Sequence, residues 1–406
     1  MLRIKAYRFR LQPTAIQAGS LQAWSGSLRF LWNWMLAQRR DAFRGSEGRV
    51  RVDYFDQAAQ LPAMKEMLPW MALVPSQALQ QTLRDLERAF INFFEGRASY
   101  PALKRRSGPS PGVRWPQGAQ VNGRCVWLPK LGWVKARLCR TVEGVIKNAT
   151  VRFDGLHWQV AIQVEQEIAT PAKQDGPSVG IDGGVRVSIA TSTGQLIELP
   201  VATEQDERRL CMLARRLSRT QPGSRRNARA RRTLLLTRRR ISNRVNDFRH
   251  KLTTRMAKNH GLIVVEDLAL RSLTRSARGS PESPGRNVAA KTRRNRSILE
   301  QGHAETVRQL GYKLSWQGAE LMKVPAAFTS QTCPECGHVC TENRPTRDRF
   351  QCVACGHAGH ADIVAAKNIL AAGLAVSARR GSREPLKREP TRLRRLHGRP
   401  TGIPAL

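Results

Sequence analysis

Residues 333–370 read CPECGHVCTENRPTRDRFQCVACGHAGHADIVAAKNIL, and this stretch decides how the whole chain is interpreted. It contains two Cys-x2-Cys pairs separated by 15 residues, formed by Cys333, Cys336, Cys352 and Cys355. Each pair can aim two thiolates at one tetrahedral ion, so the spacing predicts a zinc ribbon with one structural zinc (Zn²⁺). A redox or free-thiol role is the alternative. Seven residues after the last cysteine, Asp362 stands at the start of an amphipathic helix.

Two further acidic residues follow short apolar runs that are typical of β-strands. They are Asp182 in SVGIDGGVRVSIATSTG and Glu266 in GLIVVEDLAL. Together with Asp362 they could converge at one sheet edge, which is the arrangement of an RNase H-like core. Carboxylates in such a group hold two divalent ions ~3.5–4 Å apart, which activate a water and stabilise the leaving oxyanion. The three acids therefore predict a metal-dependent nuclease with two divalent ions at the site.

Each acid also has an ordinary structural interpretation. Asp182, followed by two glycines, could be a turn residue, and those glycines predict a tight hairpin directly after it. Asp362 could be an N-terminal helix carboxylate stabilised by the macrodipole, and Glu266 or Asp267 could cap a helix. Asp267 is the main competitor of Glu266. In an extended strand the two point to opposite faces, so only one of them should reach the metals.

The charge of the chain favours a polyanionic partner. Its 406 residues include 69 Lys and Arg against 31 Asp and Glu, a formal net charge of +38. Between residues 208 and 258 there are 18 basic residues and one acid, Asp247. Apolar residues from Ile241 to Met256 keep a helical spacing, so one face packs and the others are cationic. This surface would repel itself without phosphates, which favours nucleic acid over a plain solvated surface.

The sequence gives no signal for secretion. Its first residues, MLRIKAYRFRLQP, lack a signal-peptide apolar core, and no stretch approaches roughly 18 consecutive apolar residues. We therefore expect a soluble, cytoplasmic, nucleoid-associated protein without a membrane partner. The cysteines outside the quartet are scattered, as ordinary thiols of a reducing compartment would be: Cys125, Cys139, Cys211 and Cys340.

The N-terminal part combines strands with helices. Residues 3–11 alternate as a strand, and a hairpin turning at Asp154-Gly155 lies in a β-rich stretch from 108 to 168. We expect a small antiparallel sheet or barrel that the first strand completes, with residues 13–107 as a helical insertion. Two apolar seams at 3,4,3,4 spacing predict core helices: Leu21, Trp24, Leu28, Leu31 and Met35, then Leu79, Leu83, Leu86, Phe90 and Phe93.

The chain loosens after Glu266. The segment SLTRSARGSPESPGRNVAAKTRRNRS is either a mobile lid beside the acids or a plain disordered loop. A helix is expected from about residue 298 to about residue 317, followed by a strand, AELMKV. Beyond residue 373 the tail is basic and poor in apolar residues, which predicts disorder and a role in holding nucleic acid.

An ordered set of segments runs almost from end to end of the chain: KAYRFRLQPTAIQ, FLWNWML, PSQALQQTLRDLERAFINFF, LPKLGWVK, GIDGGV, VVEDL, AFTSQTCPECGH and ADIVAAKNIL. With this set the chain resembles the TnpB family, the OrfB-type proteins encoded by insertion sequences and related to compact type V CRISPR effectors. The resemblance implies a prokaryotic, transposable-element protein that cleaves double-stranded target DNA under the direction of a guide RNA from the element's end. The monomer is the expected state.

The resemblance also assigns roles to residues. Asp182, Glu266 and Asp362 would be the carboxylates of a RuvC-like nuclease site, where they hold Mg²⁺. The four cysteines would hold the zinc in an insertion before the last of these acids. The family usually has Asn two residues after the final aspartate, and here that residue is Val364. Activity should survive this departure, although hydrogen bonding near the metal would differ.

The implied fold is a multidomain α+β protein. An RNase H-like (RuvC) α/β core would span residues 173–372, with the zinc ribbon inserted at 328–357. A small β-barrel wedge domain, residues 1–12 and 108–172, would be interrupted by a helical recognition lobe, residues 13–107. Residues 373–406 would form the basic disordered tail. A non-cleaving RNA-guided regulator and an accessory DNA-binding transposase are the alternatives on the same scaffold, and the presence of all three acids argues against loss of cleavage.

Overall fold

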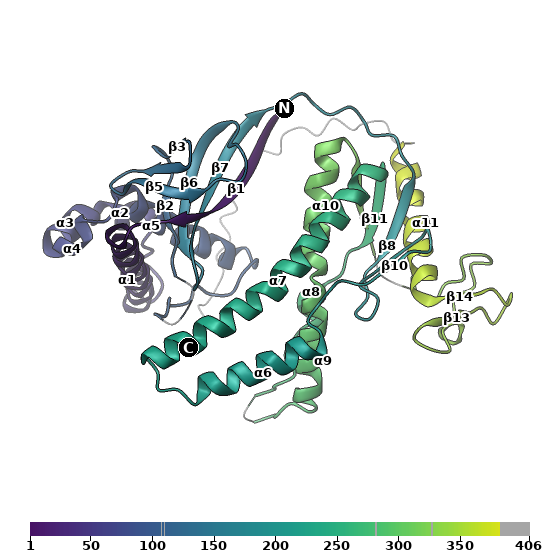
Figure 1. The fold of residues 1–406 in the computed structure, drawn as a ribbon. Helices are drawn as coiled ribbons and strands as arrows, with labels where there is room; N and C mark the ends of the chain where they lie inside the picture. The colour runs from purple at the N-terminus through teal and green to yellow at the C-terminus, as the bar shows by residue number, and fades with distance from the viewer. Residues whose placement is uncertain (107, 109, 281, 326–327, 382–406) are drawn as a thin grey trace. The chain divides into compact units, whose positions relative to one another are not determined.

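The computed structural model describes residues 1–381, except residues 107, 109, 281 and 326–327. The chain folds into two compact units of mixed α and β structure (Figure 1). The first unit combines Met1–Thr170 with Asp206–Arg240, and the second combines Pro171–Gln205 with the chain from Ile241 onward. Helix α7 (Arg225–Asn259) contributes residues to both units. The predicted domain boundaries remain a prediction.

A seven-stranded antiparallel sheet forms the centre of the first unit. Its order is β2-β6-β7-β1-β5-β4-β3, so the first strand of the chain lies in the middle, between β7 and β5. The sheet curls into a half-barrel whose edge strands β2 and β3 are not paired with each other in the described chain. The expected antiparallel sheet with the first strand is present, and the expected barrel is corrected to a half-barrel. The strands are β1 (Leu2–Gln12), β2 (Val113–Trp115), β3 (Gln120–Asn122), β4 (Cys125–Leu128), β5 (Gly132–Arg137), β6 (Val145–Phe153) and β7 (Trp158–Glu167).

The predicted hairpin at Asp154-Gly155 is confirmed. Strands β6 and β7 pair up to Phe153 and Trp158, and Gly155 adopts a φ of +90° that favours glycine. The Asp154 carboxylate closes the turn by accepting hydrogen bonds from the backbone N–H groups of Leu156 and His157, each 2.9 Å long. It also pairs with Arg239 of α7 at 2.9 Å, which fixes the hairpin to the basic helix.

Two long helices of the first unit bury the predicted apolar seams. Helix α1 begins after a capping box at Thr14, and its seam from Leu21 to Met35 is buried. In α5 the seam from Leu79 to Phe90 is also buried, and both helices belong to the core that contains the sheet. The helices are α1 (Ala15–Gly45), α2 (Tyr54–Ala59), α3 (Leu61–Met67), α4 (Pro69–Ala72) and α5 (Ser76–Phe94).

Helices α6 (Glu204–Ser218) and α7 carry the cationic stretch. Of its 18 basic residues, all except Arg239 and Arg249 are exposed. The predicted packing face of α7 is confirmed for Val245, Leu252 and Met256, which are buried, and is wrong for Phe248, which is exposed. One face therefore holds the helix in place and the others present cations to solvent.

The second unit is built on a five-stranded mixed sheet in the order β10-β9-β8-β11-β12. Strands β8, β11 and β12 are parallel to one another, and β9 and β10 complete the sheet by antiparallel pairing. Because β8 and β11 are adjacent and parallel, their carboxyl ends lie at the same edge. The strands are β8 (Ser178–Asp182), β9 (Ile189–Thr191), β10 (Leu196–Ile197), β11 (Leu262–Glu266) and β12 (Glu320–Val324).

Helices cover both faces of this sheet (Figure 1). Ile263 and Val265 of β11 pack with Leu252 of α7 and Leu310 of α10 on one face, while Val264 packs with Ile369 of α11 on the other. This alternation follows from the two-residue period of a strand. The remaining helices and the ribbon strands are α8 (Leu270–Leu273), α9 (Val288–Gln301), α10 (His303–Gln317), η1 (Thr341–Asn343), β13 (Arg349–Gln351), β14 (Ala358–His360) and α11 (Ala361–Gly381).

Helix α11 lies directly against β8 because Gly180 has no side chain. A Cβ atom at Gly180 would lie 2.1 Å from the carbonyl oxygen of Ala366 and 2.8 Å from the backbone nitrogen of Leu370. Residues Ala361–Arg379 are long and apolar enough to cross a membrane by composition, which the sequence interpretation did not anticipate. Their contacts with β8, β11 and β12 are those of a helix packed on a sheet.

Three expectations for this unit are corrected. Helix α11 continues to Gly381, so residues 373–381 of the expected disordered tail are helical; Gly373 packs closely against Val264, and residues 382–406 lie outside the described chain. The single helix expected from about residue 298 to about residue 317 is two helices, α9 from Val288 and α10 from His303, separated by Gly302 with its φ of +60°. The two glycines after Asp182 do not form a tight hairpin, because a loop of residues 183–188 separates β8 from β9.

The close contact at Gly180 generates the first prediction. Gly180→Ala should destabilise the protein by about 3 kcal/mol, because the new Cβ atom meets backbone atoms that cannot move aside. Gly311→Ala in α10 is the matched control, since its Cβ atom would meet only Leu321 Cδ2 at 3.5 Å. That change should stabilise the protein by about 0.5–1 kcal/mol, the usual gain for Gly to Ala inside a helix. Urea unfolding followed by circular dichroism measures both, and equal stability of Gly180→Ala and the parent would contradict the packing argument.

Candidate metal centres

The three predicted acids lie on elements that meet at one sheet edge. Asp182 ends β8 and Glu266 ends β11, so both lie at the carboxyl ends of adjacent parallel strands. Asp362 lies in the first turn of α11, the helix that packs against both strands. The side chains are close enough for Asp182 to be influenced by the charges of Glu266 and Asp362.

Burial and repulsion raise the pKa of Asp182 to about 7. Burial is the larger cause, followed by the negative charges of Glu266 and then Asp362, while the positive charge of Arg344 acts in the opposite direction. Burial also raises the pKa of Glu266. The site therefore concentrates negative charge that a cation would stabilise.

Glu266 is oriented by a hydroxyl group, while its neighbour Asp267 points elsewhere. Thr329 donates a 2.7 Å hydrogen bond to Glu266 Oε1, and this bond lowers the pKa of Glu266 against the effect of burial. Asn368 of α11 holds the Thr329 segment by donating to the carbonyl oxygens of Thr329 and Thr332 at 2.8 and 2.7 Å. Asp267 is exposed and pairs with Lys323 at 3.1 Å, as the expected opposite directions of the two acids require.

Asp362 has a cationic partner from the loop that carries the cysteines. Arg344 Nη2 lies 3.2 Å from Asp362 Oδ1, and the same guanidinium group donates to the Arg347 carbonyl oxygen. Arg344 therefore neutralises part of the charge at the cluster of acids. Neither Arg344 nor Thr329 was identified from the sequence, because a loop arginine and a loop threonine carry no spacing signal.

Val364 does not face the acids. It is 2% exposed and packs in a small core with Phe350, Ala361, Cys333 and Cys352. The residue that departs from the family pattern therefore joins α11 to the cysteine loops through apolar contacts.

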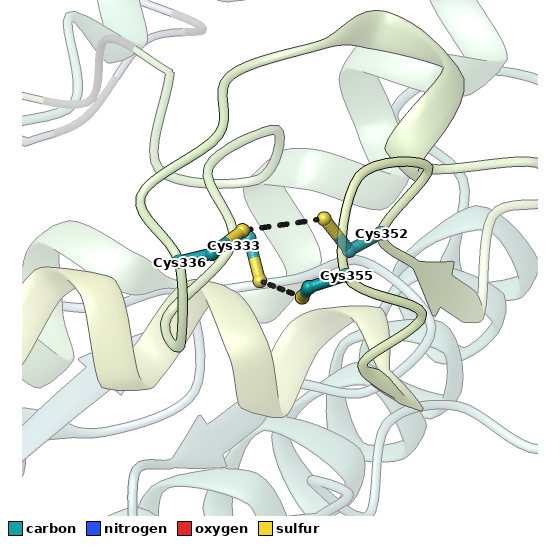
Figure 2. A group of neighbouring side chains, drawn as sticks. All are labelled: Cys333, Cys336, Cys352 and Cys355. Carbon is teal, nitrogen blue, oxygen red and sulfur yellow. Dashed lines mark hydrogen bonds between the residues drawn. The ribbon is translucent and has the colours of Figure 1, made fainter.

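The sulfur atoms of the four cysteines lie close together. Among the described residues, they are the set of three or more His, Cys, Asp or Glu side chains whose ligand atoms all lie within 4.8 Å of one another. The three carboxylates are spaced more widely than that. Sγ–Sγ distances of 3.6 Å join Cys333 to Cys355 and Cys336 to Cys352, which is far longer than a disulfide bond (Figure 2).

The two halves of the quartet have the same local geometry because they share the pattern Cys-x2-Cys-Gly-His. In the first half Cys333 N–H donates to His338 O at 2.9 Å, and in the second Cys352 N–H donates to His357 O at 2.8 Å. Gly337 and Gly356 adopt φ values of +73° and +76°, which favour glycine. Each half is a turn that directs two sulfur atoms inward, the arrangement that tetrahedral zinc requires.

Asn343 connects the two halves and was missed by the sequence interpretation. Its fully buried side chain donates to the carbonyl oxygens of Gln331 and His338 on the first loop, at 2.8 and 3.1 Å. It accepts a 2.9 Å hydrogen bond from Val353 N–H on the second loop. Removal of this amide would leave the N–H of Val353 without its partner and would take one of two donors from each carbonyl oxygen, because Gln331 O also accepts from Cys340 N–H and His338 O from Cys333 N–H. Asn343 is followed directly by Arg344.

Three family models match the chain. The model "Probable transposase" of the OrfB IS605 type matches residues 159–277, and the "Cas12f1-like, TNB domain" model matches residues 303–369. A third, described as a "Helix-turn-helix domain", matches residues 1–47. Those residues hold β1 and the continuous 31-residue helix α1 in this structure.

Two curated relatives match over nearly their full lengths. "Putative RNA-guided DNA endonuclease InsQ" of Escherichia coli K12 is 40% identical, and the match covers 97% of this chain and 99% of the relative. "Putative RNA-guided DNA endonuclease" of Streptomyces pristinaespiralis is 32% identical over 96% of each chain. A solved Cas12f1–sgRNA–target DNA complex matches with a TM-score of 0.48 and 14% identity, over 91% of this chain and 98% of that chain. The identities of 40% and 32% over nearly the full lengths of these two relatives, together with the ordered motifs, show that the chain belongs to the TnpB family, the OrfB-type proteins of IS605 insertion sequences.

Proposed function

We propose that this protein is an RNA-guided DNA endonuclease of the IS605 TnpB type, with Asp182, Glu266 and Asp362 as the catalytic carboxylates. The observation that carries the proposal is the meeting of these three acids at the end of β8, the end of β11 and the start of α11. The full-length similarity to InsQ supports the same activity. The five-stranded mixed sheet beneath the acids supports an RNase H-like, RuvC-type core.

The residues at the sheet edge fit Mg²⁺. All three candidate ligands offer carboxylate oxygens, the donors that this hard cation prefers, and their mutual repulsion would be relieved by positive charge. Asp182, Glu266 and Asp362 would hold two ions. When bound, the ions would supply an activated water and a stabilised leaving oxygen for phosphodiester hydrolysis. Thr329 and Arg344 orient Glu266 and Asp362 without adding negative charge.

One zinc ion in the cysteine quartet would be structural. Four protein ligands close a tetrahedral coordination sphere, so no position remains for a reacting water. The pKa of Cys352 is lowered to about 6; burial opposes this change, but N–H groups of Cys355 and Ala354 and neighbouring thiols favour the thiolate. The ribbon would then fix the start of α11, since Cys333 and Cys352 share a core with Val364.

Guide RNA and double-stranded target DNA would be the partners. The exposed cations of α6 and α7 suit the phosphates of nucleic acid. In this proposal residues 1–12 and 108–172 act as the wedge domain, residues 13–107 as the recognition lobe and residues 173–372 as the nuclease domain. Guide pairing would read most of the target, and the protein would read a short adjacent DNA motif.

Plasmid cleavage by the purified protein–RNA complex tests the activity. The parent should cut a guided target in Mg²⁺, and Asp182→Ala should reduce the rate at least about a hundredfold while target binding persists, because one metal ligand is lost. Asp267→Ala is the matched control, since this neighbouring acid points away and pairs with Lys323. It should cleave like the parent.

Two outcomes would reject parts of this proposal. Equal rates for Asp182→Ala and the parent would reject the catalytic assignment. If the parent binds its guided target in Mg²⁺ but leaves it uncut, the protein is a guided regulator instead. Sequencing of RNA that copurifies with the protein should identify a discrete species that ends in element-flanking sequence.

Zinc content tests the quartet. Cys352→Ala should lose the one zinc per chain that we expect of the parent, because three thiolates no longer close the coordination sphere. Cys139→Ala changes an exposed cysteine outside the quartet and should retain it. Mass spectrometry of the purified proteins measures the metal, and a full equivalent of zinc in Cys352→Ala would contradict the assignment.

The raised pKa of Asp182 predicts a pH-dependent stability difference in buffer free of divalent ions. The pKa rises from an ordinary value of 3.8 to about 7, so within this window the folded protein holds a proton that the unfolded chain has released. Stability from this group is therefore lost as pH rises through the window. The stability of Asp182→Asn relative to the parent should therefore increase as pH rises through this window, reaching about 2 kcal/mol above pH ~7. One pKa unit corresponds to about 1.4 kcal/mol, and the expected gain is smaller than the full shift because solvent screens part of it. Unfolding of both proteins at a series of pH values measures this gain, and a pH-independent difference would contradict it.

A further inference from the structure

We propose that Gln301 and His303, at the corner between α9 and α10, are positioning residues that fix the backbone directly after Asp182. This inference rests on the proposed catalytic role of Asp182. The loop of residues 183–188 begins with Gly183 and Gly184, and glycines have the widest conformational freedom of any residue. A carboxylate that binds a metal must be positioned to within about 0.5 Å. The flexible backbone next to Asp182 therefore needs contacts from other segments to fix its conformation.

Gln301 holds the loop through both ends of its side-chain amide. Its Nε2 donates to the carbonyl oxygen of Val185 at 2.8 Å, and its Oε1 accepts from the hydroxyl group of Ser188 at 2.7 Å. Ser188 in turn accepts a 2.9 Å hydrogen bond from Leu199 N–H, beyond the next two strands. Both side chains are buried, Gln301 at 6% exposure and Ser188 at 2%, and the two bonds of Ser188 are shielded from solvent.

His303 fills the space that Gly183 leaves open. A Cβ atom at Gly183 would lie 2.7 Å from His303 Nδ1 and 2.9 Å from Cε1, so the ring lies against the residue next to Asp182. The ring also forms a hydrogen bond with the backbone of Gly184. The two glycines are therefore needed for close approach: Gly183 to His303, and Gly184 to the carbonyl oxygen of Val187, which a Cβ atom would meet at 2.4 Å.

The corner is itself anchored to the helical layer. Arg249 of α7 is buried and donates to the carbonyl oxygen of Gln301 at 3.2 Å and to Asn246 Oδ1 at 2.8 Å. Gly302 adopts a φ of +60°, and a Cβ atom there would lie 2.6 Å from Arg249 Nη2. A chain of hydrogen bonds thus runs from α7 through Gln301 to the loop after Asp182.

The contacts of Gln301 and His303 are hydrogen bonds to particular residues of one loop, unlike general apolar packing of a core. Loss of these hydrogen bonds should weaken metal binding at the acids while leaving the fold and guided target binding intact. Residues that orient metal ligands typically change metal affinity or activity by about 10–100-fold.

The experiment uses the full-length protein–RNA complex with Gln301→Ala, His303→Ala and Ser188→Ala, and with Ser297→Ala as the matched control. The Ser297 hydroxyl, one turn earlier on α9, bonds only to the backbone of its own helix at Arg293. Three quantities are measured for each variant: Mn²⁺ affinity by electron paramagnetic resonance, the Mg²⁺ concentration for half-maximal cleavage, and target affinity. Melting temperatures are recorded alongside.

We expect Gln301→Ala and His303→Ala to weaken Mn²⁺ binding and raise the Mg²⁺ requirement about tenfold, with target affinity unchanged. Ser188→Ala loses the contacts with Gln301 and with Leu199 N–H, so it should weaken Mn²⁺ binding in the same direction. Because the two side chains share one contact, the loss in the double variant should be smaller than the sum of the two single losses. Ser297→Ala should match the parent.

The proposal is overturned if Mn²⁺ affinity is unchanged in Gln301→Ala and His303→Ala, or if target affinity falls in step with cleavage. The Mn²⁺ titration tests this inference separately from the proposed function. If the parent fails to cut guided DNA, the endonuclease activity is rejected. The Mn²⁺ affinities of the parent and the variants still show whether Gln301 and His303 position the acids.

Discussion

The contact between β8 and α11 at Gly180 is the constraint on which the second unit depends. Asp182 ends the strand and Asp362 begins the helix, so the distance between the two elements sets the distance between the two carboxylates. Since a Cβ atom at Gly180 would overlap the α11 backbone, any larger residue there would separate the elements. Glu266 is brought to the same edge by the parallel pairing of its strand with β8.

The other end of this arrangement is the cysteine loop region. Its small core includes Val364 of α11, and its Arg344 reaches Asp362, so one insertion contacts the helix by apolar packing and by charge. A zinc ion there would affect Asp362 indirectly. It would fix the two cysteine loops, and these loops position Arg344, which pairs with Asp362, and pack against the start of α11. Val364 supplies the apolar part of this connection, since it packs with Cys333 and Cys352 of the loops.

The sequence was informative where residues act through local spacing. The cysteine quartet, the hairpin at Asp154, the first strand and the two helical seams all depend on neighbours within a few turns, and the structure has each of them. It was uninformative where contacts join distant segments. Thr329 reaches Glu266 across 63 residues and Gln301 reaches Val185 across 116, and neither partner has a periodic pattern. The half-barrel and the early start of α9 were missed because strand closure and helix entry are decided by tertiary packing.

The groups that surround the three acids share a chemical property that the acids themselves impose. Thr329 offers a hydroxyl group, Arg344 a guanidinium group, and Gln301 and His303 contact only backbone and hydroxyl groups of the loop. None adds negative charge to a cluster in which burial and repulsion already raise the pKa of Asp182 to about 7. A fourth carboxylate would have increased the repulsion and competed for cations. Neutral and positive side chains orient the acids without adding to their repulsion. The second unit can therefore keep a cluster of negative charge within a chain whose net charge is +38.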